Sequence, residues 1–296
     1  MTSQKLRIAT RGSTLAVAQA EMVKEALLRL NPSLDIELVL VKSYGDLHPN
    51  LSLSKIGGQG VFINEIRKAV LSNKADICVH SLKDLPTYAH NELVMPAVLK
   101  RGDVRDALVG KSLKSLKSNA TVATGSQRRL IQLKALRDDL NFIDLRGNII
   151  TRLKKIPKDG AIVVAYAALK RLGLEEKVAE ILETETVIPQ VGQGAIAVEC
   201  RAKDFNISEL LKEINDLKTF KEVTLERVFL ENLGAGCSQA VGAYAQSSGS
   251  KIAFSYLVGR PNGSFLRSQR ILNNANAFKV VAEIGKECQS FMSQVD

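Results

Sequence analysis

The sequence contains no tryptophan, and aromatic residues make up only 5% of its 296 positions. Proteins that bind single-stranded nucleic acid usually stack bases on exposed aromatic side chains, so this composition argues against that class. Apolar runs are short as well: the longest extends from residue 161 to residue 169, against the ~20 residues that a membrane-spanning helix needs. The first residues, MTSQKLRIAT, contain no apolar stretch of the length typical of a secretory signal. We therefore predict a cytoplasmic protein without membrane association.

Cysteine is scarce, and its four copies, Cys78, Cys200, Cys237 and Cys288, lie far apart. No CxxC spacing occurs, which argues against a disulfide framework and against a zinc site, and we predict no metal. Cys78, Cys200 and Cys288 fall in apolar strand or helix patterns that fit a protein core. Cys237 lies in a loop of small residues that leaves its sulfur accessible, so a nucleophile, an attachment point and a spectator thiol all remain open.

Positive charge is distributed unevenly along the chain. The formal net charge is +10, and residues 99–194 hold 18 basic and 11 acidic residues, which gives +7 for that segment. Such a basic surface predicts an anionic partner, either nucleic acid or a small polyanion, although a solvated basic face without a function has the same composition. No P-loop pattern is present, and no G-x-G-x-x-G follows a strand, so a nucleotide cofactor is not expected.

In the first half of the chain, short apolar strands alternate with helical patterns, which is typical of an α/β fold. We predict strands at 6–10, 35–41, 75–80, 121–123, 142–145, 161–165 and 196–200, and helices at 14–30, 62–72, 128–136, 149–155, 208–217 and 221–233. The remaining residues predict a small α+β domain with strands at 241–245, 251–258 and 264–272, a Pro-Asn-Gly turn at 261–263 and an amphipathic helix from Ala277. IATRGS at 8–13 and VATGS at 122–126 each lead from a strand into a helix, which suggests two similar α/β units.

Polar residues concentrate where these strands end. Ser13 and Ser126 fit ordinary helix N-caps, and a helix N-terminus at such a place also attracts anions. Arg128 and Arg129 fall in the first turn of a predicted helix, where the helix dipole disfavours cations, so we expect an anion beside them. Arginine rather than lysine at these turns suits bidentate pairing with carboxylates or phosphates.

The segment HSLKDLP at 80–86 directly follows a buried strand. Because Pro86 biases the residue before it to an extended conformation, we predict that Lys83 and Asp84 lie in a loop at the carboxyl end of that strand. A single carboxylate there can stabilise a cation or move a proton. A surface Lys–Asp pair is the alternative interpretation, and His80 fits a core or supporting position better than a catalytic base.

Taken together, these segments resemble the porphobilinogen deaminase (hydroxymethylbilane synthase) family over nearly the whole chain. The order and spacing of the motifs carry the resemblance: TRGS at 10–13, KIGG at 55–58, VHSLKDLP at 79–86, TGSQRR at 124–129, RGN at 146–148, VGQGA at 191–195 and GC at 236–237. The resemblance implies an α/β fold with two periplasmic-binding-protein-like α/β domains, formed by residues 1–98 with 195–215 and by residues 99–194. It also implies a C-terminal α+β domain, residues 216–296, with a three-stranded antiparallel sheet.

The resemblance further implies a reaction and a site. Family members join four porphobilinogen molecules head to tail, with loss of ammonia, onto a dipyrromethane primer, and then release hydroxymethylbilane by hydrolysis in tetrapyrrole (heme) biosynthesis. Asp84 matches the catalytic aspartate, which stabilises the cationic azafulvene and assists proton transfer, and Cys237 matches the cysteine that holds dipyrromethane through a thioether. The residues that match carboxylate-binding positions are Arg11, Ser13, Lys83, Thr124, Ser126, Arg128, Arg129, Arg146, Arg152 and Arg171. The residues placed on or beside a mobile loop are Asp46, Lys55, Gln59 and Phe62.

A few positions depart from the family pattern, and two other functions remain open. Gln59 stands where lysine is usual, and the further departures, which concern loop geometry more than the reaction, are Ala168, Ala235 and Ala240. A non-catalytic anion-binding module is one alternative, although it leaves Cys237 and the C-terminal domain unexplained. A basic nucleic-acid-binding protein is the other, and it requires a steep salt dependence of binding. We favour the transferase, acting on porphobilinogen as a monomer without nucleic acid.

Overall fold

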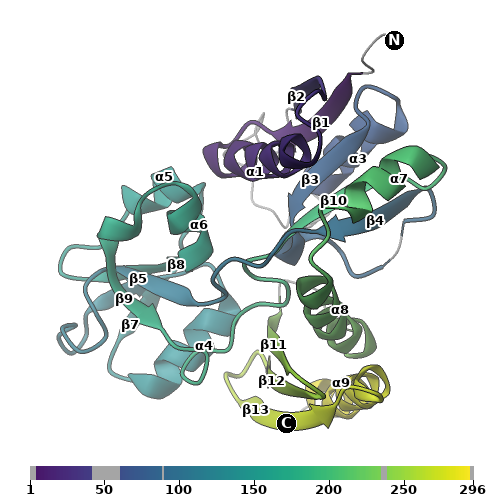
Figure 1. Cartoon of the computed structure of the whole chain (residues 1–296). Helices are drawn as coiled ribbons and strands as arrows, with labels where there is room; N and C mark the ends of the chain where they lie inside the picture. Colours follow the sequence, from purple (N-terminus) through teal and green to yellow (C-terminus); the bar gives the residue numbers. More distant parts are fainter. Residues whose placement is uncertain (1–4, 42–60, 89, 235–238, 294–296) are drawn as a thin grey trace. The chain divides into compact units, whose positions relative to one another are not determined.

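The computed structural model describes residues 5–41, 61–88, 90–234 and 239–293, with Val61 and Phe62 by their backbone alone (Figure 1). The chain divides into two compact units, Met1–Arg101 with Ala195–Phe220 and Gly102–Gly194 with Lys221–Asp296. The sequence-based division into three domains differs in treating the C-terminal part of the second unit separately, and it stays a prediction. None of the helices in the described ranges combines the length and the apolar composition that crossing a bilayer needs.

The first unit is built around a five-stranded mixed sheet with the strand order β2-β1-β3-β10-β4. Its strands are β1 (Leu6–Arg11), β2 (Ile36–Val41), β3 (Ile77–Ser81), β4 (Leu93–Val98) and β10 (Ile196–Arg201). β1 runs parallel to β2 and β3, whereas β10 is antiparallel to both of its neighbours. Side chains alternate along β1, so Ile8 packs in the apolar cluster with α1 (Thr14–Leu30) and α7 (Phe205–Lys212), and Ala9 packs in the cluster with α3 (Val61–Leu71). The sheet therefore lies between two helical layers (Figure 1).

The second unit repeats this topology in its five-stranded sheet, which has the order β7-β6-β8-β5-β9. Its strands are β5 (Asp106–Gly110), β6 (Thr121–Ala123), β7 (Asn141–Ile143), β8 (Ala161–Ala165) and β9 (Val178–Leu182). β6 is parallel to β7 and β8, and β5 is antiparallel to β8 and β9. One face packs against α4 (Gln127–Leu136), and the other packs against α5 (Ile149–Leu153) and α6 (Tyr166–Arg171), while a 3-10 turn (Glu175–Lys177) precedes β9. The two similar units predicted from IATRGS and VATGS are confirmed, because the two segments follow equivalent strands, β1 and β6.

The C-terminal part of the second unit is a three-stranded antiparallel sheet with two helices. Its strands are β11 (Ala240–Ser248), β12 (Lys251–Gly259) and β13 (Phe265–Asn273). The helices are α9 (Ala277–Ser293) and α8 (Leu217–Asn232), of which residues 221–232 belong to this unit. The core between sheet and helices contains Phe229, Phe254 and Tyr256, whose ring centroids lie 5.4–5.9 Å apart. Gly263, with φ of +92°, closes the predicted turn between β12 and β13, where the amide of Arg260 donates to the carbonyl of Ser264 at 2.8 Å.

The predicted fold class is confirmed, but some predicted elements are wrong or missing. Strands β4, β5 and β9 were not expected; β4 contains Pro96 and lies at a sheet edge, where proline is tolerated. The predicted helix at 208–217 ends too late, since α7 stops at Lys212 and α8 starts at Leu217. Asp216 begins the second helix by accepting a hydrogen bond from the amide of Thr219 at 2.7 Å, a capping signal that the sequence carries.

Candidate functional site

Asp84 lies at the carboxyl end of β3, in the 3-10 turn Leu82–Asp84. Leu82 and Leu85 on either side of it are buried, and the amide of Leu85 donates to the carbonyl of Leu82 at 3.0 Å. The amide of Leu82 donates to the carbonyl of Ala195 at 3.0 Å, which joins the turn to the segment before β10. These contacts hold the Asp84 carboxylate exposed, and its predicted place in a loop at this strand end is confirmed.

Four predicted site residues come together at one edge of the first sheet. β1 and β3 are parallel neighbours, so their carboxyl ends meet at the same edge. Arg11 ends β1, and Ser13 caps α1 by accepting a hydrogen bond at 3.3 Å from the amide three residues further on. The amide of the Gln19 side chain contacts the hydroxyl of Ser81 at 2.7 Å and so fixes α1 against the end of β3. The predicted residues at this edge are Arg11, Ser13, Lys83 and Asp84.

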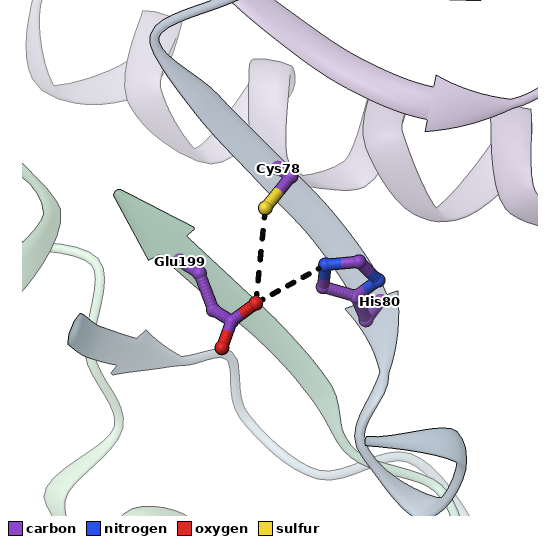
Figure 2. A group of neighbouring side chains, drawn as sticks. All are labelled: Cys78, His80 and Glu199. Atoms are coloured by element: carbon purple, nitrogen blue, oxygen red, sulfur yellow. Dashed lines mark hydrogen bonds and ion pairs between the residues drawn. The ribbon is translucent and has the colours of Figure 1, made fainter. Parts of the chain in front are cut away.

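A buried ion-pair cluster lies in the strand that leads to Asp84. Glu199 of β10 accepts hydrogen bonds from Arg67 Nε at 2.9 Å and Arg67 Nη2 at 2.7 Å. His80 Nε2 lies 3.4 Å from Glu199 Oε2, and Cys78 Sγ lies 3.8 Å from the same oxygen (Figure 2). Burial acts to raise the pKa of Glu199, but His80 and Arg67 outweigh it and lower this pKa to about 2, so the carboxylate is ionised. Burial also raises the pKa of the Cys78 thiol well above its usual range.

Thiol, imidazole and carboxylate together raise the question of a metal ion. The ligand atoms of Cys78, His80 and Glu199 lie within 4.8 Å of one another. However, Arg67 already occupies both oxygens of Glu199, and its charge repels a second cation in this buried place. The cluster is therefore a buried ion-pair network that joins α3, β3 and β10. His80 is 5% exposed, which agrees with the predicted core or supporting position.

The second sheet presents an equivalent edge, where β6, β7 and β8 end. Thr124 follows β6, and its hydroxyl accepts a hydrogen bond from the amide of Ser126 at 3.2 Å. Ser126 caps α4 by accepting from the amide of Arg129 at 3.5 Å, so the N-cap interpretation holds for both serines. A Cβ atom on Gly125 would lie 2.7 Å from the carbonyl oxygen of Leu145, so only glycine lets these two strand ends approach each other.

Two further arginines predicted to bind carboxylates lie after β7 and form hydrogen bonds with residues close to them in the sequence. Arg146 Nε donates to Asp144 at 2.8 Å, and both side chains are more than half exposed. Arg152 Nε donates to the carbonyl of Gly147 at 2.7 Å, and Asn148 caps α5 between them. Exposed ion pairs of this kind contribute little to stability, so Arg146 is free to exchange partners at small cost.

The twin arginines of α4 converge on a carboxylate that the sequence did not indicate. Asp106, the first residue of β5, is completely buried, and Arg128 and Arg129 are 2% and 5% exposed. Arg129 donates to Asp106 Oδ1 through Nε at 3.1 Å and Nη2 at 2.7 Å, and Arg128 Nη2 lies 2.8 Å from Oδ2. Gln193 Nε2 donates to Oδ1 at 2.9 Å. The anion expected beside these arginines is thus a side chain of the protein itself.

Arg171, at the end of α6, is half-buried without a carboxylate partner in the described part of the chain. Its Nη2 donates to the carbonyl of Gly194 at 2.5 Å. Burial lowers the pKa of Arg171 to about 10, since no anion in the described ranges compensates for the lost water. A guanidinium in this state gains from an anionic ligand.

Two family models together match most of the chain. Residues 6–209 match the model described as "Porphobilinogen deaminase, dipyromethane cofactor binding domain", and residues 220–293 match "Porphobilinogen deaminase, C-terminal domain". The chain belongs to the porphobilinogen deaminase family.

Curated relatives agree with this assignment over most of their length. The porphobilinogen deaminase of Buchnera aphidicola subsp. Acyrthosiphon pisum is 43% identical over 277 residues, covering 92% of this chain and 88% of the relative. The porphobilinogen deaminase of Roseiflexus castenholzii is 42% identical over 271 residues, covering 90% of this chain and 89% of the relative.

Among solved structures, the methionine-binding protein MetQ is similar over 73% of this chain and 92% of its own chain, with a TM-score of 0.45 and 12% sequence identity. A TRAP periplasmic solute-binding protein from Desulfovibrio salexigens is similar over 77% of this chain and 76% of its own chain, with a TM-score of 0.42 and 14% sequence identity.

Membership of the porphobilinogen deaminase family decides among the three functions that the sequence left open. The chain is a transferase of tetrapyrrole biosynthesis, a hydroxymethylbilane synthase, and its cofactor is dipyrromethane. Each pyrrole of that cofactor carries an acetate and a propionate, so a fitting site must offer cations. Arg171 fits, because its buried charge lacks a carboxylate partner among the described residues.

Some predicted site residues lie outside the described ranges, and two charged residues were missed. The predictions for Cys237 and for the loop residues fall outside: Asp46, Lys55, Gln59 and the side chain of Phe62. Glu199 was missed because its partner Arg67 lies 132 positions away, and Asp106 was missed because β5, which holds it, was not predicted. The one available signal was the pair of arginines in α4, which called for an anion of unspecified origin.

Proposed function

We propose that Asp84 is the catalytic carboxylate of the hydroxymethylbilane synthase reaction in this chain and that Cys237 holds the dipyrromethane through a thioether. The observation that supports the role of Asp84 is its place. The carboxylate is exposed on a turn anchored by two buried leucines, at a sheet edge that also carries Arg11 and Lys83. Rigid support and exposure together suit a group that must meet a substrate in a defined orientation.

Asp84 acts on the positive charge that develops as porphobilinogen loses ammonia. An ionised carboxylate that accepts a hydrogen bond from a pyrrole N–H binds more strongly as that ring becomes cationic, and this difference lowers the barrier. The same carboxylate can take up and return a proton at that nitrogen. When bound, dipyrromethane supplies a covalently held primer for the growing chain.

The basic and capping residues at the two sheet edges bind the acetate and propionate groups. In the first unit these are Arg11, Ser13 and Lys83. In the second unit they are Thr124, Ser126, Arg128, Arg129, Arg146, Arg152 and Arg171. Guanidinium groups hold carboxylates in two parallel charge-assisted hydrogen bonds, and the capped helix N-termini add backbone N–H donors. Arg171, which lacks a carboxylate partner among the described residues, and the exposed Arg146 support this assignment.

The intact mass of the purified protein tests the attachment, and turnover tests Asp84. We expect wild type to exceed its sequence mass by one dipyrromethane and Cys237→Ser to match its own sequence mass. Asp84→Asn should keep the adduct and lose turnover by about 10²- to 10⁴-fold. Asp138→Asn, at an exposed aspartate after α4, is the matched control and should turn over normally. An Asp84→Asn protein with normal turnover, or an adduct that persists in Cys237→Ser, would contradict the respective assignment.

The cellular setting is proposed on separate grounds: the protein acts as a cytoplasmic monomer. Cys78, Cys200 and Cys288 are all free thiols, which is typical of a reducing compartment. The sequence contains no heptad repeat that would favour a coiled-coil assembly. Cell fractionation and sedimentation equilibrium test these two points, and a membrane-bound fraction or a dimer mass would contradict them.

A further inference from the structure

Asp106 is a buried carboxylate in direct contact with three side chains of family motifs. Its Oδ1 accepts hydrogen bonds from Arg129 and Gln193, and its Oδ2 lies 2.8 Å from Arg128 Nη2. Although burial by itself raises the pKa of Asp106, the two arginines lower it well below its usual range, so the group is ionised at neutral pH. One negative and two positive charges share this buried place, which leaves a net charge of +1.

The remaining contacts of the two arginines show why this carboxylate determines their geometry. Arg128 Nη1 donates to the carbonyl of Ile188 at 2.7 Å, and Arg129 Nη1 donates to the carbonyl of Val163 at 3.1 Å. These backbone carbonyls orient the Nη1 group of each guanidinium, but they do not neutralise its positive charge. Asp106 alone, among the described residues, forms ion pairs with the two, and without it like charges would repel each other in a buried place.

Arg128 keeps a donor that the described part of the protein does not use. Arg128 Nε is buried and has no hydrogen-bond partner in the described ranges. The Asp106 carboxylate cancels only one of the two charges. The pair therefore retains both the unmet donor and the single positive charge that a ligand carboxylate would satisfy.

We propose that Asp106 is a positioning residue for carboxylate binding: it fixes Arg128 and Arg129 in one arrangement and sets their joint charge to +1. This inference rests on the proposed role of the two arginines in binding the carboxylates of dipyrromethane and substrate. Gln193 supports the same arrangement, since it donates to Asp106 and also to the carbonyl of Val104 at 2.7 Å.

A second carboxylate in the chain provides a matched control. Asp76 is also shared by two arginines, at 2.8 Å from Arg7 Nη2 and 3.3 Å from Arg201 Nη2, and neither arginine is a predicted site residue. Asp76→Asn therefore removes the same kind of ion-pair network without touching a carboxylate-binding position. A merely structural Asp106 would behave like Asp76.

The test measures loading of the cofactor site as well as turnover. Cofactor-free wild type, Asp106→Asn and Asp76→Asn are incubated with increasing porphobilinogen, and intact mass gives the fraction that carries the adduct. Displacement of the two guanidinium groups should weaken carboxylate binding by about tenfold or more. We therefore expect half-loading of Asp106→Asn to need at least about ten times more porphobilinogen than half-loading of wild type. We expect Asp76→Asn to load as wild type does, and urea unfolding of the same samples records the stability that each variant loses.

Each outcome bears on the proposal. Loading of Asp106→Asn at wild-type concentrations, or an equal defect in Asp76→Asn, would overturn it while leaving the proposed function intact. Should Asp106→Asn fail to fold, Gln193→Leu removes the 2.9 Å bond to Asp106 without changing charge and should shift loading in the same direction. An unshifted Gln193→Leu would then overturn the proposal. A wild-type protein that never gains an adduct would overturn the proposed function and this inference with it.

Discussion

Replacing Glu199 by glutamine tests how strongly the buried cluster of Arg67, His80 and Glu199 stabilises the first unit. Glutamine keeps the shape and an acceptor oxygen but removes the negative charge. Arg67 and Glu199 are 4% and 5% exposed, so water screens their interaction little. The substitution leaves the Arg67 guanidinium buried without a counter-charge, which typically lowers the free energy of unfolding by about 3–5 kcal/mol.

The pKa of Glu199 provides an independent measure of the same interaction. Burial favours protonation, but His80 and Arg67 prevail and lower this pKa from its ordinary 4.5 to about 2. The difference corresponds to a stabilisation on the order of 3 kcal/mol. Because the folded pKa lies below the unfolded one, this stabilisation is fully present above the unfolded pKa of 4.5 and is lost as the pH falls towards 2.

Urea unfolding of wild type and Glu199→Gln at pH 7 and pH 3 checks both values. Far-UV circular dichroism is the suitable probe, since the sequence contains no tryptophan. We expect wild type to be more stable by about 3 kcal/mol at pH 7 and this difference to shrink by about 2 kcal/mol at pH 3. Glu209→Gln, which breaks an exposed pair with Lys212, should change stability by less than about 0.5 kcal/mol. A Glu199→Gln effect that is the same at both pH values would refute the electrostatic reasoning.

Three further predictions concern packing, backbone and thiols. Phe229→Ala should lower the free energy of unfolding by about 3–5 kcal/mol, because Phe229 is fully buried against Phe254, whereas Phe205→Ala at a 75% exposed site should lower it by less than about 0.5 kcal/mol; equal losses in urea unfolding would contradict the assigned core. Gly194→Ala should destabilise more than Gly173→Ala: both glycines have positive φ, but a Cβ on Gly194 would lie 2.7 Å from a backbone oxygen, and one on Gly173 meets open space. Calorimetry ranks the two, and the reverse order would count against the backbone geometry. In native Cys237→Ser, an aromatic disulfide reagent should label no thiol until denaturant is added, because burial raises the pKa of the remaining three, Cys78, Cys200 and Cys288. Labelling before unfolding would show that one of them is accessible.

Sequence patterns predicted the structure correctly where residues close together in the chain determine it. The predicted helix at 14–30 matches α1 at both ends, since Ser13 caps it through a bond to an amide three residues away. The predicted strand at 161–165 matches β8, whose continuous apolar run fits a strand buried on both faces. The position of Asp84 was also predicted from local pattern. The buried strand ends shortly before it and Pro86 follows, so Asp84 falls in the loop after the strand.

Sequence pattern failed where the deciding neighbour is remote in the chain. Strand β5 escaped prediction, and with it Asp106, although Asp106 supplies the anion that the twin arginines required. The arginines by themselves indicated an anion, and nothing in their neighbourhood distinguished a ligand from a side chain of the protein. The predicted helix at 208–217 is an error of a different kind, because the Asp216 cap that begins α8 binds an amide only three positions away and was readable in the sequence.

By itself, the sequence determined the α/β class, the repeat of two similar units, the helix caps and the motifs by which the family is identified. These features depend on residues a few positions apart, whose periodicity and hydrogen bonds need no distant partner. The tertiary structure decided which charges meet. Arg67 of α3 pairs with Glu199 of β10 across 132 positions, and Arg129 of α4 pairs with Asp106 of β5 across 23 positions. These pairs depend on the places of β10 and β5 as antiparallel strands in their sheets, and the low dielectric of the buried surroundings strengthens the attraction between the charges.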